Sequence, residues 1–389
     1  MYYVMLVVNK FRDSVHSFFA RISISFGRCL GQLAGIHVSS TQDGSSSATE
    51  AISGVTSRHR FDVADAEGWL SHLWTEGFVV LSGVLTPSDC DYSEDLLWEF
   101  LEEATEGQWK RHDVYSWQDD DVFRKLGGRA PDIGLVNSRG AGQSELSWFL
   151  RERTKRVFAT LWGTDDLITS FDGIGIFRPW RHVSTTGGVS VGFLKNRTRG
   201  GWLHVDQGRS TAGQMCCVQG LVSLYEQNAR TGGFQVVPKS HLLHKEIVDE
   251  FADDQLVDYV EPPADRLSRE DSGLEPPRLV VTQAGDVILW DSRTLHASTP
   301  GFVEEEDNAA TLPEKGDVAT SKLLRAVVYV CMTPKHFASP RILTQRRQAY
   351  DIKATTSHWP HKNVMGFGWA RGKALKYADA PDVRKDLIC

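Results

Sequence analysis

Residues 200–207 of the chain read Gly-Gly-Trp-Leu-His-Val-Asp-Gln. This stretch places His204 two residues before Asp206. On a β-strand, residues i and i+2 point to the same face, so the imidazole and the carboxylate can converge on one point. Such a pair suits Fe(II) when a second histidine completes one triangular face of the metal and leaves other positions open. The stretch therefore predicts a metal site if a further histidine lies downstream.

A second histidine and a strand-borne arginine follow later in the chain. Residues 285–291 are typical of a turn that leads into a strand, and His296 comes shortly after them. Residues 323–330 predict another strand, on which Arg325 alternates with Val327 and Tyr329. An arginine among apolar neighbours is costly unless a carboxylate pairs with it, and a dicarboxylate cosubstrate would supply one. The alternative is that His204 and Asp206 form a hydrogen-bonded pair and that Arg325 lies at a strand edge.

Composition indicates a soluble globular protein. The 389 residues are 41% hydrophobic and 24% charged, with a net charge of −7, so neither nucleic acid nor an anionic membrane is expected as the main partner. The six cysteines include no C-x-x-C pair, which favours free thiols in a reducing compartment. We therefore expect an intracellular protein, either cytoplasmic or organellar.

The N-terminal residues differ from the rest of the chain. The first eight residues are apolar but too short to span a bilayer, so no stable membrane insertion is expected. Residues 11–33 are rich in arginine and serine and poor in acids, which is typical of organellar transit peptides, although a dispensable tail is an equal alternative. Residues 39–57 indicate a linker. We predict a tail over residues 1–58 and one folded domain over residues 59–389, with inserts near 240–274 and 302–322.

Short strands dominate the second half of the chain. We expect strands at 168–177, 215–225, 233–237, 278–282, 286–290 and 323–332, separated by turns rather than by regular helices. Helices are expected at 65–75, after the N-cap Thr86, and at 144–162, the last with a basic, solvated face that includes Arg151. Because few helices lie between the strands, a mainly β barrel or sandwich with flanking helices is favoured over a parallel α/β fold.

The remaining histidines are interpreted as structural. His241 and His244 follow a predicted turn, where capping is a more common role than metal binding. His358 and His361 flank a proline that prevents a regular helix, and no carboxylate lies close to them in sequence. We expect these four residues to serve in packing or on the surface.

Several motifs together resemble the phytanoyl-CoA dioxygenase family of Fe(II)/2-oxoglutarate-dependent oxygenases. The resemblance rests on His204-x-Asp206, the stretch Gly-Gly-Phe-Gln-Val-Val-Pro-Lys-Ser-His at 232–241, His296-x-Ser298 and Arg325. It covers about residues 61–333. It implies a double-stranded β-helix of the jelly-roll, cupin-like type.

The resemblance also implies a set of site residues. Fe(II) would be bound by His204, Asp206 and His296. Arg325 and Ser298 would bind 2-oxoglutarate, with a weaker role for Gln219. Arg325 follows His296 at a longer spacing than is usual for the family, which the polar insert between them explains because loop insertions cost little. Arg293 is a rival for the cosubstrate, but it precedes His296.

The expected function is a dioxygenase that uses Fe(II), 2-oxoglutarate and O2 to hydroxylate a small organic substrate, with succinate and CO2 as co-products. Two alternatives remain open at this point. One is a cupin-like binding protein without oxygenase turnover, and the other is a metal-dependent cupin enzyme that does not use 2-oxoglutarate. The sequence identifies neither the substrate nor the oligomeric state.

Overall fold

The computed structural model describes residues 56–57, 59–127, 131–186, 189–194, 197–252, 258–302, 322–362, 366–367 and 382–389. These ranges lie within one compact unit, Ala51–Cys389. Most of the predicted tail and nearly all of the predicted 302–322 insert fall outside the described residues.

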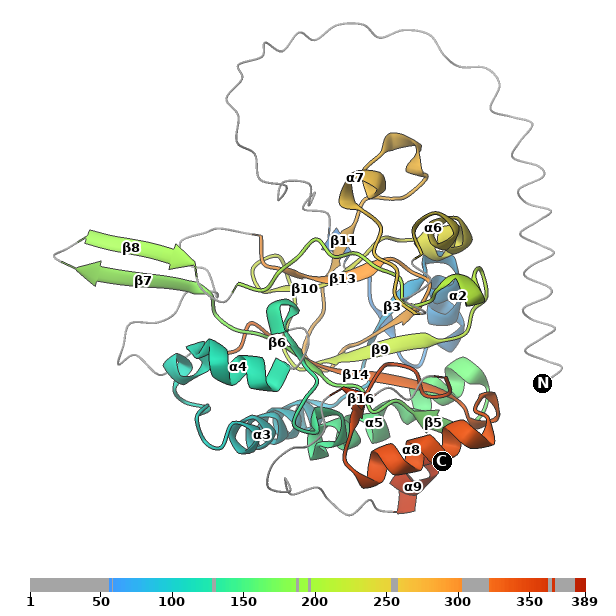
Figure 1. Cartoon of the computed structure of the whole chain (residues 1–389), viewed down its shortest axis with the longest axis horizontal. Helices are drawn as coiled ribbons and strands as arrows, with labels where there is room; N and C mark the ends of the chain where they lie inside the picture. The colour runs from blue at the N-terminus through green and yellow to red at the C-terminus, as the bar shows by residue number, and fades with distance from the viewer. Residues whose placement is uncertain are drawn as a thin grey trace, which may run out of the picture. The chain divides into compact units, whose positions relative to one another are not determined.

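Two sheets form the frame of the molecule (Figure 1). The larger sheet has eight strands, in the order β2 (Phe61–Asp62), β3 (Phe78–Ser82), β12 (Val287–Asp291), β9 (Val218–Ser223), β14 (Arg325–Pro334), β6 (Ile174–Phe177) and β4 (Leu135–Val136), with β5 (Leu167–Thr169) also paired to β14. The smaller sheet has the order β1 (Thr56–Ser57), β11 (Arg278–Val280), β10 (Gly232–Val236) and β13 (His296–Pro300). Two hairpins, β7 (Arg181–Thr186) with β8 (Val189–Leu194) and β15 (Thr355–Thr356) with β16 (Gly366–Phe367), form separate two-stranded sheets.

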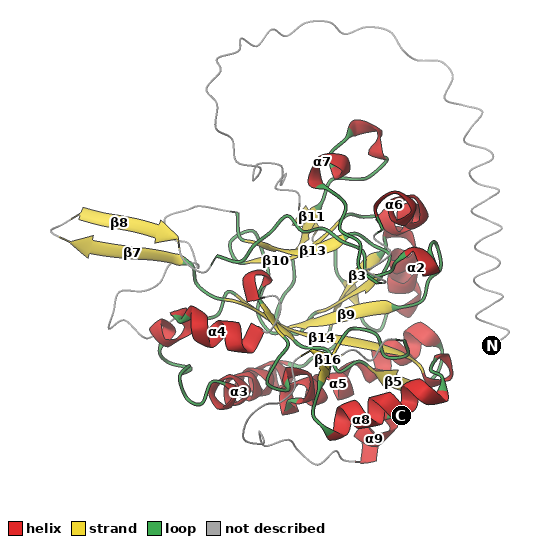
Figure 2. Ribbon diagram, in the orientation of Figure 1, coloured by secondary structure: helices red, strands yellow, loops and turns green. Residues whose placement is uncertain are grey.

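Helices flank the sheets (Figure 2). Helices α3 and α5 lie against the larger sheet, in a core that also takes side chains from β3, β9 and β14. The helices are α2 (Ala66–Glu76), α3 (Pro87–Ala104), α4 (Asp120–Gly127), α5 (Glu145–Trp162), α6 (His244–Phe251), α7 (Ala264–Leu267), α8 (Pro340–Asp351) and α9 (Asp382–Ile388). The predicted β-rich architecture with flanking helices is therefore confirmed.

Local sequence explains where the first long helices begin. The Thr86 side chain accepts a hydrogen bond from the amide of Asp89 at 3.1 Å, and the Asp89 carboxylate accepts one from the amide of Thr86 at 3.0 Å. This reciprocal capping box satisfies two amides that the first turn of α3 leaves without partners. Helix α5 was expected from residue 144, and Ser144 is its N-cap, with a side chain that accepts from the amide of Ser147. Both helices therefore begin where the sequence places them.

A second core lies between the two sheets. Alternate residues of each strand point into it, because successive side chains on a strand point to opposite faces. Its members come from β3, β9, β12 and β14 of the larger sheet and from β10 and β11 of the smaller one: Phe78, Val80, Leu221, Phe234, Val236, Val280, Ile288, Trp290 and Val327. The same inward alternation places Arg325 and Tyr329 on the face of β14 that Val327 occupies.

Three local predictions differ from the structure. Residues 168–177 form two strands, β5 and β6, rather than one. His204 and Val205 form only isolated bridges, so the 200–207 stretch is not a regular strand. Arg151 of α5 is fully buried rather than solvated, because its guanidinium lies 4.8 Å from the Trp148 ring, where a cation–π contact offsets part of the cost of burial.

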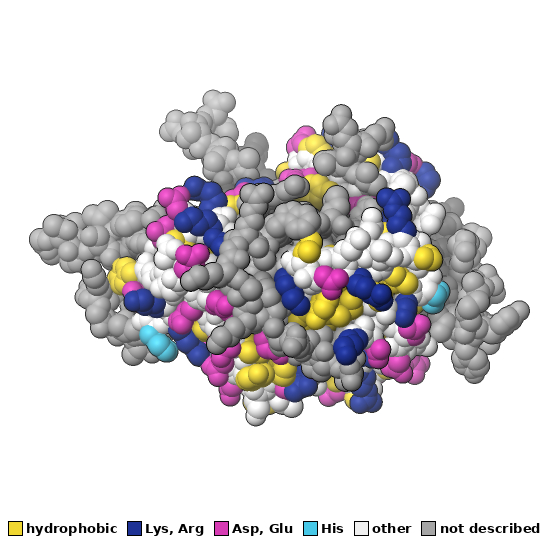
Figure 3. Space-filling model, turned by 60° about the horizontal axis from the view of Figure 1, so that its bottom comes forward, with side chains coloured by type: hydrophobic (Ala, Val, Ile, Leu, Met, Phe, Trp, Pro, Cys, Tyr) yellow, Lys and Arg dark blue, Asp and Glu magenta, His cyan; other side chains and the backbone are white. Residues whose placement is uncertain are grey.

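Surface charge is mixed on the face shown in Figure 3. Acidic and basic side chains are interspersed on the described part of this face, with small apolar areas between them. Among the described residues, no helix is both long and apolar enough to cross a bilayer.

Removing residues 1–50 is expected to leave the fold and metal binding intact. The truncated chain begins at Ala51, so it keeps β1, which pairs with β11, and Arg60, whose guanidinium bonds the buried Asp286 at 2.8 Å. Thermal unfolding and metal content of the truncated and full-length chains should therefore agree. Loss of either property on truncation would show that the N-terminal segment belongs to the domain.

Candidate metal centre

His204 and His296 face each other across a short antiparallel bridge. The amide of His204 donates to the carbonyl of His296 at 3.0 Å, and the amide of His296 donates to the carbonyl of His204 at 2.9 Å. Directly paired residues project to the same side, and the two ring centroids lie 4.4 Å apart. The bridge thus attaches the 200–207 stretch to the first residue of β13 and brings the two imidazoles together.

Asp206 completes this cluster. Its Oδ1 lies 3.5 Å from Nε2 of His204, and its Oδ2 lies 3.3 Å from Nε2 of His296. One ligand atom from each of the three residues lies within 4.8 Å of the other two. The amide of Asp206 donates to the carbonyl of Ser292 at 3.0 Å, which fixes the bend after the bridge. The sequence prediction that these three residues meet is confirmed, although a bridge and a bend, rather than a strand, bring them together.

The outer nitrogens of both rings are held by backbone carbonyls. Nδ1 of His204 lies 3.1 Å from the carbonyl of Trp202, and Nδ1 of His296 lies 2.9 Å from the carbonyl of Thr294. A carbonyl only accepts, so each Nδ1 is the donor, and in the neutral form of the ring the lone pair is on Nε2. Both lone pairs are therefore on the side of Asp206, which is the arrangement a metal requires of its histidine ligands.

The charge states also suit a metal ion. Burial alone would raise the pKa of Asp206, but the neighbouring His358 and His204 hold it well below its usual range. Burial lowers the pKa of His296. A metal binds a carboxylate in its ionised form and an imidazole in its neutral form, and both shifts favour those forms. The donor set of two imidazoles and one carboxylate is the one that Fe(II) takes in oxygenases with open coordination positions.

Aromatic and amide groups fix the position of the three ligands. The Trp202 ring stacks on His204 with a centroid separation of 4.8 Å, and Tyr259 stacks on it at 4.7 Å. Nε2 of Gln219 donates to Oδ2 of Asp206 at 2.8 Å. Gln219 was predicted to contact a cosubstrate, whereas here it orients the carboxylate. A side chain that hydrogen-bonds a metal ligand in this way keeps the ligand in the orientation that the metal needs.

Arg325 lies buried with an unsatisfied nitrogen. The side chain is 1% exposed, its Nε donates to Oε1 of Gln227 at 2.8 Å, and its Nη1 has no hydrogen-bond partner. A Cβ atom added to Gly175 would lie 2.9 Å from this Nη1 and 2.9 Å from the hydroxyl of Tyr329. Both polar groups therefore lie close to the same glycine, where a larger residue would displace them, and the unpaired Nη1 is a donor that a carboxylate could bind.

Ser298 lies two residues after His296 on β13, on the same face of the strand. It pairs across the sheet with Phe234. The amide of Phe234 donates to Oε1 of Gln227 at 3.2 Å, and this oxygen also accepts the hydrogen bond from Arg325. The Ser298 hydroxyl itself reaches only the carbonyl of Ile133, at 3.5 Å. Backbone pairing thus links Ser298 to the residues around Arg325.

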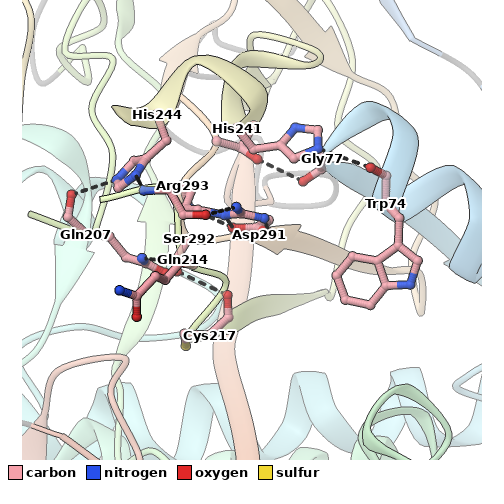
Figure 4. Close-up of polar contacts among 12 residues, drawn as sticks. Trp74, Gly77, Gln207, Gln214, Cys217, His241, His244, Asp291, Ser292 and Arg293 are labelled. Atoms are coloured by element: carbon pink, nitrogen blue, oxygen red, sulfur yellow. Dashed lines mark hydrogen bonds and ion pairs between the residues drawn. The ribbon is translucent and has the colours of Figure 1, made fainter. Parts of the chain in front are cut away.

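The rival arginine and two further histidines have structural partners (Figure 4). Arg293 forms a two-point contact with Asp291, at 2.9 Å from Nε and 2.7 Å from Nη2, so it is engaged away from the cosubstrate. Nε2 of His244 lies 3.0 Å from the carbonyl of Gln207, and Nε2 of His241 lies 3.1 Å from the carbonyl of Trp74. His241 and His244 thus bind the backbone, in agreement with the structural role expected for them.

His358 is the residue of this region that sequence reasoning missed. It was expected on the surface or in packing, but it is one of the groups that lower the pKa of Asp206. Its Nε2 is buried and has no hydrogen-bond partner. No local signal indicates this position, because the ligands are more than 60 residues away in the chain. The five cysteines within the described residues are free, as predicted.

A histidine–carboxylate–histidine cluster beside a buried arginine is characteristic of non-haem iron oxygenases that use 2-oxoglutarate. The chain matches the model of the family "Phytanoyl-CoA dioxygenase (PhyH)" over residues 74–301, more than half of its length. It belongs to this family and is an Fe(II)- and 2-oxoglutarate-dependent oxygenase. The predicted family resemblance is confirmed.

Known relatives are distant in sequence. The "Ava biosynthesis cluster protein O" of Aspergillus versicolor is 23% identical over 305 residues, which cover 76% of this chain and 87% of that protein. A "Putative phytanoyl-CoA dioxygenase" of Dictyostelium discoideum is 22% identical over 246 residues, or 57% of this chain and 67% of that protein. The crystal structure of AviO1 from Streptomyces viridochromogenes Tue57 aligns with a TM-score of 0.40 and 18% identity, covering 70% of this chain and 96% of that one.

Proposed function

We propose that the chain hydroxylates a small organic substrate, with Fe(II) held by His204, Asp206 and His296. The convergence of two Nε2 lone pairs and one ionised carboxylate within 4.8 Å is the observation that carries this assignment. The two facing sheets, with the cluster at the edge of their shared core, support a double-stranded β-helix.

The cofactors supply the oxidising chemistry: 2-oxoglutarate and O2 give succinate and CO2, and one oxygen atom of O2 enters the substrate as a hydroxyl group. The protein's own groups orient the reactants. Gln219 holds the Asp206 carboxylate, while Trp202 and Tyr259 fix the plane of the His204 ring. The ligands themselves are buried, which limits the access of water.

We further propose that the space between Arg325 and Tyr329 takes the far carboxylate of 2-oxoglutarate. The Arg325 guanidinium is fixed by Gln227 and lies over the Phe177 ring at 5.0 Å, so it is preorganised with Nη1 still to be satisfied. The hydroxyl of Tyr329 borders the same space. A carboxylate placed there would receive a charge-assisted hydrogen bond from Arg325 and a second hydrogen bond from Tyr329. Ser298, on the neighbouring strand, is a further candidate donor.

Gly175→Ala is expected to weaken 2-oxoglutarate binding by about tenfold or more while sparing the metal. The added methyl group would lie 2.9 Å from Arg325 Nη1 and from the Tyr329 hydroxyl, so both side chains must move and one hydrogen bond to the cosubstrate is lost. Isothermal titration with 2-oxoglutarate, on protein of measured metal content, checks this. The matched control is Gly220→Ala on β9, where the new methyl meets Leu289 and the carbonyl of Val330 instead. Equal affinity in Gly175→Ala and wild type would remove the cosubstrate from this space.

The proposed function is tested by the consumption of 2-oxoglutarate. Protein loaded with Fe(II) anaerobically and then exposed to O2 should convert 2-oxoglutarate to succinate and CO2, slowly without substrate and faster when a substrate is present. A metal-loaded protein that binds 2-oxoglutarate but never forms succinate would be a binding protein. One that binds iron but not 2-oxoglutarate would be a metal-dependent enzyme of another kind.

A further inference from the structure

The chain after β14 returns to the metal centre, although it lies beyond the residues matched by the family. The match ends at residue 301, while residues 335–362 form α8 and the segment that follows it. The amide of Thr356 donates to the carbonyl of Phe171 at 2.7 Å, and Nη1 of the buried Arg346 donates to the carbonyl of Pro360 at 2.9 Å. These two contacts fix the backbone on both sides of His358.

One side-chain anchor joins this segment to the Asp206 side of the centre. Trp359 is 2% exposed and packs in one cluster with Cys217 and Cys331. Cys331 of β14 is the direct cross-strand partner of Gln219, whose side-chain amide bonds Asp206. The residue after His358 is therefore packed against the strand pair that supports the carboxylate ligand.

A second anchor joins the segment to the His204 side. Nζ of Lys362 bonds Oδ1 of Asp258 at 2.7 Å. The next residue, Tyr259, stacks on the His204 ring, and Val260 pairs with Val205. Trp359 and Lys362, one and four residues after His358, thus attach this segment to residues that support Asp206 and His204.

The His358 side chain lies in the neighbourhood of the metal ligands. Asp206, His296 and His204, together with Asp258, are near enough to influence the pKa of His358, which burial lowers. Its Nε2 is nevertheless buried without a partner, and an unpaired buried polar atom is unfavourable. A polar group bound between His358 and the metal ligands would satisfy it.

We propose that His358 is a substrate-positioning residue of this oxygenase, whose Nε2 hydrogen-bonds the polar group on the open side of the metal. During turnover that group would be a hydroxyl or carbonyl oxygen of the substrate, close to the carbon that is oxidised. The proposal rests on the proposed metal site. It also means that the substrate pocket includes a residue from the segment beyond the family match.

Proximity to the metal can be measured without any turnover. Co(II) and Zn(II) forms of the full-length protein are compared by NMR of histidine ring protons, with assignments from His358→Gln and His361→Gln. His361 is the matched reference in the same segment, because its Nδ1 lies 3.1 Å from Thr333 Oγ1 and its ring contacts Phe337. The paramagnetic shift of the His358 ring should clearly exceed that of His361. A smaller or equal shift would overturn the proposal.

Hydrogen bonding on the open side is tested with azide as the probe. Azide is titrated into the Co(II) form and followed by its visible spectrum. His358→Phe should weaken azide binding by about tenfold, because an aromatic ring is kept and the hydrogen bond is lost, while His358→Gln should restore part of the affinity. His361→Gln should bind azide like wild type. Equal azide affinity in His358→Phe and wild type would contradict the proposal.

Failure of the metal site itself would give a different result. If the wild-type protein binds Co(II) no better than His204→Ala does, the proposed metal centre is wrong, and His358 loses its role with it. If Co(II) binds in wild type and is lost in His204→Ala, but the His358 shift does not exceed that of His361 and His358→Phe binds azide like wild type, only the role of His358 is wrong.

Discussion

His204→Ala is expected to reduce Fe(II) affinity by more than about 100-fold and to abolish 2-oxoglutarate turnover. Removing a residue that only hydrogen-bonds a metal ligand commonly lowers metal affinity by about 10–100-fold. His204→Ala should have a larger effect, because it removes one of the three ligands themselves. Among the described residues the ligand cluster contains His204, Asp206 and His296 alone, so no other imidazole is in place as a substitute. Anaerobic titration of Fe(II), with iron content after dialysis, measures the effect.

The matched control is His244→Ala. His244 is also buried and also binds the backbone, through Gln207 and through the amide of Gly213 at 3.0 Å. Both substitutions should lower the free energy of unfolding by about 1–3 kcal/mol, because each leaves a cavity and removes hydrogen bonds. Iron binding should be lost only in His204→Ala. Full iron occupancy and turnover in that variant would show that the ligand assignment is wrong.

Much of the metal centre is predictable because its chemistry restricts the residue types. A histidine and a carboxylate two positions apart, a later histidine and an arginine on an apolar strand are each visible in the sequence. The core strands are predictable for a similar reason, since their runs of apolar residues allow few other structures. The cap at Thr86 is local, and the structure places it as predicted.

Other features depend on contacts between distant parts of the chain. The 200–207 stretch is held by the backbone of His296, and no pattern within the stretch distinguishes such a bridge from a strand. Arg151 is buried because the rings of Trp148 and Phe171 cover its guanidinium, although its neighbours in sequence are those of a solvated helix face. The segment that carries His358 is held near the metal ligands by contacts of Trp359 and Lys362 with residues that are distant in sequence.

The two parts of the site differ in how completely they are formed. The metal ligands already have hydrogen bonds to backbone carbonyls and to Gln219, so they are held in place without a ligand. The cosubstrate space instead contains an unsatisfied nitrogen of Arg325. Binding of 2-oxoglutarate should therefore stabilise the fold, because it binds the native state and satisfies a buried group.

Arg325→Gln is expected to weaken 2-oxoglutarate binding by about 30- to 5,000-fold, since loss of one partner of a buried charged hydrogen bond costs about 2–5 kcal/mol. Iron content should not change, because Arg325 contacts Gln227 and the Phe177 ring rather than a metal ligand. Isothermal titration measures the affinity. The rise in melting temperature that 2-oxoglutarate gives the wild-type protein should also disappear in the variant.

Arg293→Gln is the control for this prediction. Its guanidinium pairs with Asp291, which is fully buried, so the substitution leaves an unpaired charge and should destabilise the fold more than Arg325→Gln does. Its affinity for 2-oxoglutarate at a temperature where both variants are folded should nevertheless equal that of wild type. If Arg325→Gln kept wild-type affinity while Arg293→Gln lost it, the cosubstrate would bind at Arg293, and the space beside Gly175 would have another ligand.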